Sequence, residues 1–333
     1  MGKHSNISFF IPHLGCPHRC SFCDQRSITG HNKLPSPQDI KEAVDIAIKS
    51  KVYSSKNCEI AFFGGSFTAI DRKYMLSLLK AAYPFVKDGI IKGIRVSTRP
   101  DAIDEEILNI LKEYGVTAIE LGAQSMDNQV LLANKRGHTA QDVINSSYLI
   151  KQYGFSLGLQ MMTGLYKASE ESDLYTVKEF IKISPDTVRI YPTVVLKGTA
   201  LAGLVNSGEY IPPSLESTVN ACCKYYKEFS DNRINVIRMG LHHIEENDYV
   251  SGPWHPAFSE LCISQMFFEE AVNKLKKMGK GRYIIYVSEK QISAAVGQKK
   301  CNLNKLEKLN YICRIKTDIT LKDKEFRIEK EVR

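Results

Sequence analysis

Three cysteines near the start of the chain, Cys16, Cys20 and Cys23, are the residues most able to do chemistry. Their spacing, C-x₃-C-x₂-C, places three thiols on one short loop directly after the apolar run Ile7 to Ile11. Three thiolates are one short of a closed tetrahedral zinc site, whereas a four-iron cluster held by three thiolates keeps one iron open for another ligand. The loop therefore predicts a metal centre. A zinc site is the alternative, because cysteine motifs in reduced compartments are often zinc sites.

Other residues suited to binding a ligand end or follow the next apolar runs. They are Gly64, Gly65, Ser66, Ser97, Gln124 and Gln160. Paired glycines after a strand allow close approach of backbone to a ligand, although such a pair is more often only a tight turn. Taken singly, a glutamine or an arginine such as Arg136 is as often structural as functional. His138, His242, His243 and His255 are weaker candidates for bases or ligands, with His138 the best of them.

The order of predicted elements shows how these residues are brought together. Strand-like runs at 6–11, 58–63, 93–97, 116–121, 155–161, 186–191 and 234–239 alternate with helix-like stretches at 36–50, 72–83, 104–114, 140–153, 169–183 and 214–229. Alternating strands and helices predict a parallel sheet with right-handed crossovers, and ligands bind at the carboxyl ends of such strands. We therefore expect an α/β fold, a partial (β/α)₆ barrel with the candidate residues along one rim.

A second, smaller unit is expected after the Gly252-Pro253 turn. We predict a core of residues 1–250 and a basic α+β domain of residues 251–333, with a helix at 258–278, a strand at 283–288, a short helix at 290–296 and strands near 311–317 and 325–329. Residues 274–333 contain 17 Lys and Arg against 7 Asp and Glu, in a chain whose net charge is +8. Basic residues with interleaved aromatics, here Tyr283, Tyr286, Tyr311 and Phe326, are typical of RNA-binding surfaces, although charge runs are usually only solvated faces.

The composition is that of an ordinary globular chain, with 43% hydrophobic and 25% charged residues. No apolar run is long enough to cross a bilayer, and the first residues lack the features of a signal peptide. The six cysteines outside the loop have no ligand-like spacing, which fits buried thiols in a reducing compartment. These features predict a cytoplasmic protein with no membrane partner.

The cysteine spacing, with an aromatic residue before the last cysteine, resembles the signature of the radical S-adenosylmethionine (SAM) enzymes. The resemblance extends to the Elongator catalytic subunit through five stretches that span roughly residues 5–240: Ser97 to Asp101, Glu120 to Ser125, Asn134 to Thr139, Ile190 to Thr193 and Lys197 to Thr199. The chain is similar to the shorter bacterial proteins of this group, which lack the acetyltransferase domain. Acetyl-CoA is therefore not expected as a co-substrate.

The resemblance implies a [4Fe-4S] cluster on Cys16, Cys20 and Cys23, with SAM bound to the open iron. It implies that Gly64, Gly65 and Ser66 meet the amino group of SAM, with Ser66 in place of the acidic residue of the family. It implies further that Gln124 and Arg136 contact the ribose and carboxylate of SAM, and that Ser97 and Gln160 line the same pocket. The expected partners are tRNA, as the substrate whose base is modified, and an external one-electron donor.

Two other functions remain open. The first is a small-molecule radical SAM enzyme resembling oxygen-independent coproporphyrinogen oxidase, which needs no basic surface. The second is a non-catalytic zinc or iron–sulfur protein that binds RNA. The sequence does not identify a catalytic base, the transferred group or an oligomeric state.

Overall fold

The computed structural model describes residues 5–11, 14–16, 19–23, 34–51, 53–241 and 244–331. Its main feature is a seven-stranded sheet in the order β1-β2-β3-β4-β5-β6-β8, in which every neighbouring pair is parallel. The strands are β1 (Ser5–Ile11), β2 (Cys58–Gly64), β3 (Gly93–Thr98), β4 (Val116–Gln124), β5 (Ser156–Thr163), β6 (Thr187–Pro192) and β8 (Asn235–Met239). The predicted partial barrel is confirmed as an open half-barrel, with β8 as its seventh strand.

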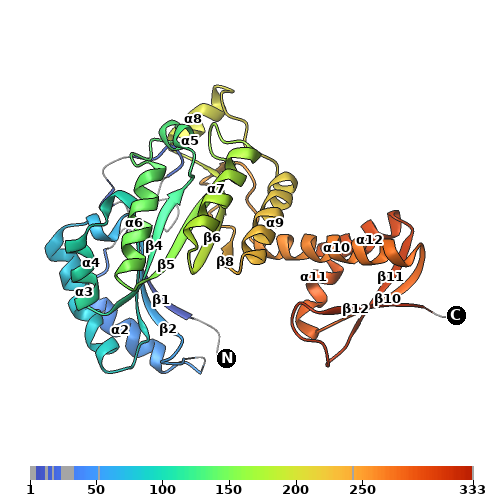
Figure 1. The fold of residues 1–333 in the computed structure, drawn as a ribbon, viewed down its shortest axis with the longest axis horizontal. Coiled ribbons are helices and arrows are strands. Elements are labelled where there is room, and N and C mark those ends of the chain that lie inside the picture. Colours follow the sequence, from blue (N-terminus) through green and yellow to red (C-terminus); the bar gives the residue numbers. More distant parts are fainter. Residues whose placement is uncertain are drawn as a thin grey trace.

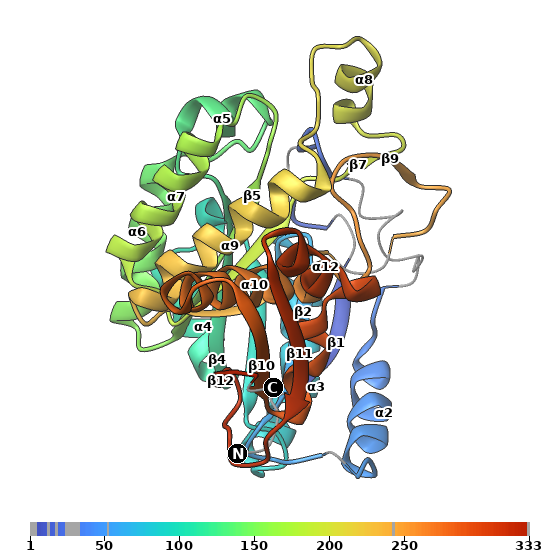
Figure 2. The ribbon, with the colours of Figure 1, turned by 90° about the vertical axis from the view of Figure 1, so that its right-hand side faces the viewer.

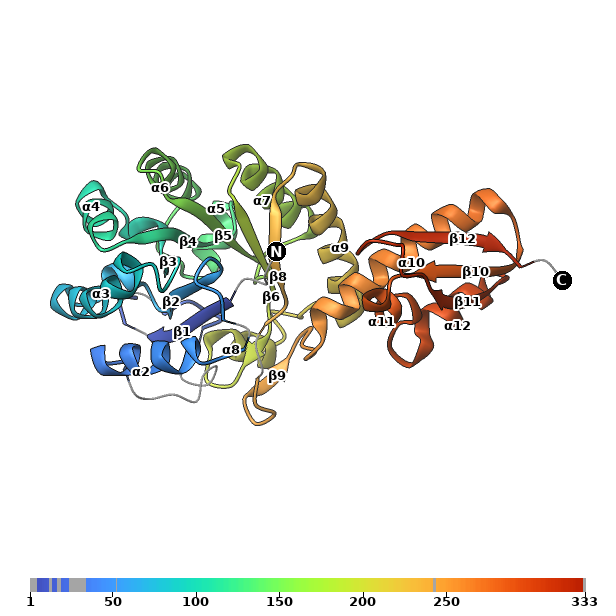
Figure 3. The same cartoon turned by 90° about the horizontal axis from the view of Figure 1, so that it is seen from below.

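Six helices form an arc around the outside of this sheet (Figure 3). They are α2 (Pro37–Ile48), α3 (Arg72–Lys87), α4 (Glu105–Glu113), α6 (Ala140–Gln152), α7 (Glu170–Ile183) and α9 (Leu215–Asp231). Helix α2 begins as the sequence predicts, with Pro37 in its first turn and a capping box between Ser36 and Asp39. The sequence analysis did not predict α5 (Asn128–Ala133), α8 (Ala200–Asn206) or the ribbon of β7 (Val195–Leu196) and β9 (Tyr249–Ser251).

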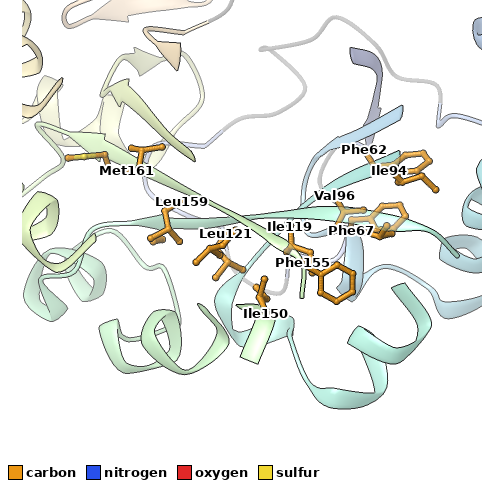
Figure 4. Close-up of a cluster of buried hydrophobic side chains, with 14 of the residues drawn as sticks. Phe62, Phe67, Ile94, Val96, Ile119, Leu121, Ile150, Phe155, Leu159 and Met161 are labelled. Carbon is orange, nitrogen blue, oxygen red and sulfur yellow. The ribbon is translucent and has the colours of Figure 1, made fainter. Parts of the chain in front are cut away.

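The main core lies between the outer face of the sheet and these helices (Figure 4). Alternate strand residues such as Ile94, Val96, Ile119 and Leu121 point into it and are fully buried. The other residues of each strand face the hollow of the half-barrel, because side chains alternate across a strand. Polar side chains on the strands are thus concentrated on the concave face.

The C-terminal residues form a smaller unit beside the half-barrel, joined to it by the long helix α10 (Phe258–Met278) (Figure 1). Its sheet has the order β11-β10-β12, built from β10 (Gly281–Val287), β11 (Tyr311–Thr317) and β12 (Phe326–Lys330), with α11 (Ile292–Val296) and α12 (Cys301–Lys308) packed near α10. Phe258 and Cys262 on α10 belong to the main core, whereas Phe267 belongs to a second core. The domain boundary at residue 250 stays a proposal.

The expectation that four aromatic residues of this unit lie on its surface is wrong for three of them. Tyr283, Tyr311 and Phe326 are 0%, 3% and 8% exposed and form part of the second core. Their strands bury one face against α10, α11 and α12, so the aromatics fill that layer. Tyr286 is on the opposite face, where the Arg327 guanidinium lies 4.6 Å from its ring centre.

Within the described residues, no helix is both long enough and apolar enough to span a membrane.

Candidate functional site

Most of the predicted site residues lie at the carboxyl ends of the parallel strands, the end at which α5 and α8 are seen in Figures 1 and 2. The loop that follows β1 packs on the loop that follows β2. Gly65 N–H donates to the Ile11 carbonyl at 2.9 Å, and Ser66 N–H donates to the Leu14 carbonyl at 3.0 Å. A Cβ on Gly65 would collide with the Leu14 carbonyl oxygen. The Gly-Gly pair therefore supports the start of the cysteine loop, a role that the sequence analysis did not predict.

The Ser66 side chain also has a structural contact. It is 1% exposed, its hydroxyl lies 2.7 Å from the hydroxyl of Thr98, and it accepts a hydrogen bond from Arg99 N–H at 3.2 Å. These bonds tie the end of β2 to the end of β3. A predicted contact between Ser66 and a cofactor would have to be made by its backbone.

The cysteine loop places two of its thiols beside arginines. Cys20 is buried and Cys16 is half-buried. Arg136 Nη1 donates to Cys20 Sγ at 3.1 Å. Burial and the nearby Cys20 raise the pKa of the Cys16 thiol, while the guanidinium groups of Arg99 and Arg136 oppose that rise. Cys16, Cys20 and both arginines therefore form one group.

Cys23 is half-buried on the same loop, where its N–H donates to the Cys20 carbonyl at 3.2 Å. The loop is fixed to the Asn134 to Thr139 stretch by Ser21, whose hydroxyl donates to Asn134 Oδ1 at 2.7 Å. Among the described residues, no three His, Cys, Asp or Glu side chains are arranged to hold a single metal ion. The ligand roles of the three cysteines therefore stay predictions.

Arg99 is a site residue that the sequence analysis did not single out, although it lies within the Ser97 to Asp101 stretch. Its guanidinium forms a two-pronged ion pair with Asp101, at 2.9 and 2.7 Å. The remaining nitrogen, Nη1, is buried and has no partner in the part of the chain that the structure describes. Cys16 and Cys20 are among the charges that act on Arg99. A buried donor without an acceptor is costly, so this atom is suited to an anionic ligand.

Further buried polar atoms at the same rim have no partner in the described part of the chain, among them Arg136 Nε, Gln124 Oε1 and Ser97 Oγ. Gln124 also has a left-handed backbone, with φ of 67°. Residues other than glycine take this conformation rarely, and often at functional sites. Ser97, Gln124 and Arg136 thus lie at the same rim, and their contacts with a cofactor stay predictions.

His138 has a structural contact in this region. Its Nε2–H donates to the Ala123 carbonyl at 3.1 Å, and the ring is 5% exposed. Burial and the Arg136 charge lower the pKa of His138 to about 4. Near neutral pH the imidazole is therefore uncharged. His255 accepts a hydrogen bond from Ala257 N–H on Nδ1, and His242 and His243 lie outside the described residues.

Gln160 lies deeper in the hollow than the prediction implies. Its Nε2 donates to Glu120 Oε2 at 2.9 Å. Glu120 is 1% exposed and also accepts from Arg95 Nη1 at 3.2 Å and from Arg189 Nη2 at 2.8 Å. Gln160 thus belongs to a charged network on the concave face, and the orphaned atoms at the rim are contributed by other residues.

Comparison with known families agrees with this geometry. The model of the Radical SAM superfamily matches residues 10–180, and that of the Radical_SAM C-terminal domain matches residues 185–267. This chain belongs to the radical SAM superfamily. It is accordingly an enzyme, and the family generally uses a [4Fe-4S] cluster and SAM.

Two curated relatives of this radical SAM chain carry names that refer to tRNA or to Elongator. It is 25% identical over 233 residues to a "tRNA uridine(34) acetyltransferase" of Dehalococcoides mccartyi, covering 60% of this chain and 50% of that protein. It is 30% identical over 183 residues to human "Elongator complex protein 3", covering 49% of this chain and 34% of that protein. The chain therefore spans half or less of the length of these relatives.

Among solved structures, the radical SAM chain has the fold of the archaeal Elp3 of Methanocaldococcus infernus. The TM-score is 0.65 at 22% identity, covering 81% of this chain and 64% of that one. Streptococcus suis SuiB has a TM-score of 0.51 at 15% identity, covering 72% of this chain and 50% of that one. The family matches end at residue 267, so the sheet of the C-terminal unit lies outside both.

Proposed function

We propose that this chain holds a [4Fe-4S] cluster on Cys16, Cys20 and Cys23, cleaves SAM reductively and modifies a base of tRNA. The observation that carries the first two parts is the convergence of thiols and orphaned polar atoms at one rim. Arg99 Nη1 and Arg136 Nε are buried donors without a partner in the part of the chain that the structure describes, and both arginines act electrostatically on Cys16. A negatively charged cluster or a carboxylate would accept hydrogen bonds from these donors and so satisfy them.

The donor set fits the cofactors that the family uses. Three thiolates leave one coordination position of a four-iron cluster for SAM. When bound, the cluster supplies the electron that converts SAM into methionine and a 5′-deoxyadenosyl radical. The side chains orient and shield these groups. Arg136 would hold a carboxylate through Nε while Nη1 stays on Cys20, and Gln124 Oε1 would accept from a ribose hydroxyl.

The proposed tRNA substrate is supported by the relatives and by charge. Curated relatives bear the name "tRNA uridine(34) acetyltransferase", and the C-terminal 60 residues contain 17 Lys and Arg. Cationic side chains neutralise phosphates, which is the main source of affinity for nucleic acids. Because the chain spans half or less of these relatives, the position and chemistry of the modification are not carried over.

Reconstituted protein, SAM, a chemical reductant and an unmodified tRNA transcript provide the test. We expect 5′-deoxyadenosine to form faster with tRNA than without it, and nucleoside mass spectrometry to find one new modified nucleoside. The Cys20→Ser variant is the matched control and should give neither product. If SAM is cleaved but tRNA neither accelerates cleavage nor changes in mass, the tRNA part of the proposal is wrong, and the small-molecule alternative replaces it.

A further inference from the structure

Among the described residues, the charged network on the concave face of the sheet contains more guanidinium groups than carboxylates. Two buried carboxylates, Glu59 and Glu120, accept from Arg95 at 2.8 and 3.2 Å. Glu120 also accepts from Arg189 on β6. The next strand, β8, adds Arg238, which pairs with Arg189 in the register of the sheet. Three guanidinium groups thus lie near two carboxylates. Arg95 and Arg189 are paired with these carboxylates, whereas Arg238 is not paired with either.

Arg189 reaches across the hollow. Its guanidinium carbon lies 5.4 Å from the ring centre of Phe63, which is on β2. Its Nε is buried and has no partner in the described part of the chain. Tyr191 is on the same face of β6, two residues along, and interacts electrostatically with both Arg189 and Arg238. The two guanidinium groups and the phenol therefore lie together.

Arg238 has no acidic partner within the described residues. Its Nε donates to the Gly240 carbonyl at 3.1 Å. Burial lowers the pKa of Arg238 and Arg189 adds to that, while Tyr191 opposes it. Two guanidinium groups side by side without a second carboxylate repel each other in a partly dry site. An oxyanion between them would remove that repulsion and accept from their donors.

We propose that Arg189, Arg238 and Tyr191 form a subsite for an oxyanion of the substrate, a phosphate or a carboxylate. A cavity of about 240 Å³ adjoins Arg238 and is lined also by Met239, Phe258 and Glu260. Strand β8 is an edge strand of the sheet, and Met239 and Phe258 of this lining belong to the main core. Guanidinium forks bind phosphate and carboxylate in two-pronged geometry, which sets the position of the attached base or ring.

This inference rests on the proposed function, because it assigns the subsite to the substrate of the radical reaction. The test therefore measures the binding of substrate fragments and not the cleavage of SAM. Binding of uridine, uridine 5′-monophosphate and 5-carboxyuridine is measured by titration calorimetry on the reconstituted protein with SAM present. Uridine has no anionic group. Uridine 5′-monophosphate adds a phosphate, and 5-carboxyuridine adds a carboxylate on the base.

We expect one of the two anionic probes to bind about tenfold or more tightly than uridine. Arg238→Gln should abolish that preference, and Arg238→Lys should keep part of it, since the charge stays and the fork is lost. The matched control is Arg72→Gln, which removes an exposed arginine that pairs with Glu106 on the outside of the barrel. It should leave the preference unchanged.

Equal binding of all three probes to the unaltered protein would overturn the subsite. So would an Arg238→Gln protein, with unchanged circular dichroism, that retains the full preference. If the Arg238 variants instead weaken the binding of SAM, the arginine pair belongs to the cofactor and the assignment to substrate is wrong. A chain that shows the preference but yields no 5′-deoxyadenosine would refute the proposed function and leave the oxyanion subsite standing.

Discussion

Arg136 connects the cysteine loop to the strand rim through separate guanidinium nitrogens. Nη1 donates to Cys20 Sγ, Nη2 donates to the Gly122 carbonyl, and Nε is buried without a partner in the described part of the chain. The first two contacts hold the guanidinium between the cysteine loop and the end of β4. The third atom is the one available to a carboxylate.

The Arg136→Ala variant should bind SAM about 10–100-fold more weakly, since hydrogen bonds to charged groups contribute about 1.5–3 kcal/mol. Its iron content should stay near that of the unaltered protein, because Arg136 supplies no ligand to iron. Titration of SAM, followed by the change in cluster absorbance, measures both quantities. Unchanged SAM affinity would assign Arg136 a purely structural role in fixing the loop.

His138 should make stability depend on pH. Its pKa is lowered to about 4 in the folded chain, against an ordinary value of 6.5, by burial and the Arg136 charge. Between these values the unfolded chain is protonated and the folded chain is not. The free energy of unfolding therefore falls as pH drops from about 6.5 to about 4, by on the order of 3 kcal/mol.

Urea unfolding at several pH values, compared with His138→Gln, isolates this contribution. The difference in unfolding free energy between the two proteins should change steadily across that range and stay constant above pH 7. A constant difference at all pH values would show that His138 titrates normally.

At the scale of elements, the loop after β1 and the loop after β2 form one unit, because Gly65 allows their backbones to come into contact. We expect Gly65→Ala to destabilise the fold by about 1–3 kcal/mol, the usual cost of overpacking, and to lower iron incorporation. The matched control is Gly203→Ala on α8, where an added methyl meets nothing within 4 Å. That change should be neutral or slightly stabilising, because alanine favours helix. Equal iron content in the two variants would contradict the account.

Much of the half-barrel could be predicted from sequence, because apolar periodicity and capping signals are local. Strands β2 and β3 begin at the predicted residues, Cys58 and Gly93, and each extends one residue beyond the predicted range. The short helix α8 has too few residues to show a clear period. Loop contacts such as Gly65 with Leu14 are non-local and leave no pattern in the sequence.

The site was predictable in its chemistry and less so in its geometry. Cys16, Cys20 and Arg136 lie together and Gln124 lies at the end of β4, while the cofactor contacts that the resemblance implies stay predictions. Gln160 does not contribute an orphaned atom at the rim, since its partner Glu120 is 40 residues away and the pairing depends on strand register. Register is set by the whole sheet, which no local motif encodes.

At the scale of the whole molecule, the half-barrel and the C-terminal unit differ in charge. Lys299 and Lys300 are exposed in the turn before α12, and both have left-handed backbones, with φ of 50° and 61°. Neither forms an ion pair within the described residues. If this turn binds RNA phosphates, the double variant Lys299→Ala/Lys300→Ala should flatten the dependence of log affinity on log salt by about one to two units.

Fluorescence anisotropy of labelled tRNA at several salt concentrations measures that slope. The matched control is Lys73→Ala/Lys80→Ala, which removes two exposed lysines from helix α3 of the half-barrel. It should leave the slope unchanged. A variant at 299 and 300 that behaves like this control would exclude the turn from the RNA-binding surface.

The most direct test of the central claim is the formation of 5′-deoxyadenosine from SAM by the reduced, reconstituted protein. The account predicts about four irons per chain and slow production of 5′-deoxyadenosine and methionine in equal amounts. Cys16→Ser, Cys20→Ser and Cys23→Ser should each lose the iron and the product, because a site of three ligands has no spare thiolate. Cys58→Ser, which changes a thiol buried in β2, should retain both. Loss of iron and product in Cys58→Ser but not in Cys20→Ser would contradict the assignment of the cluster.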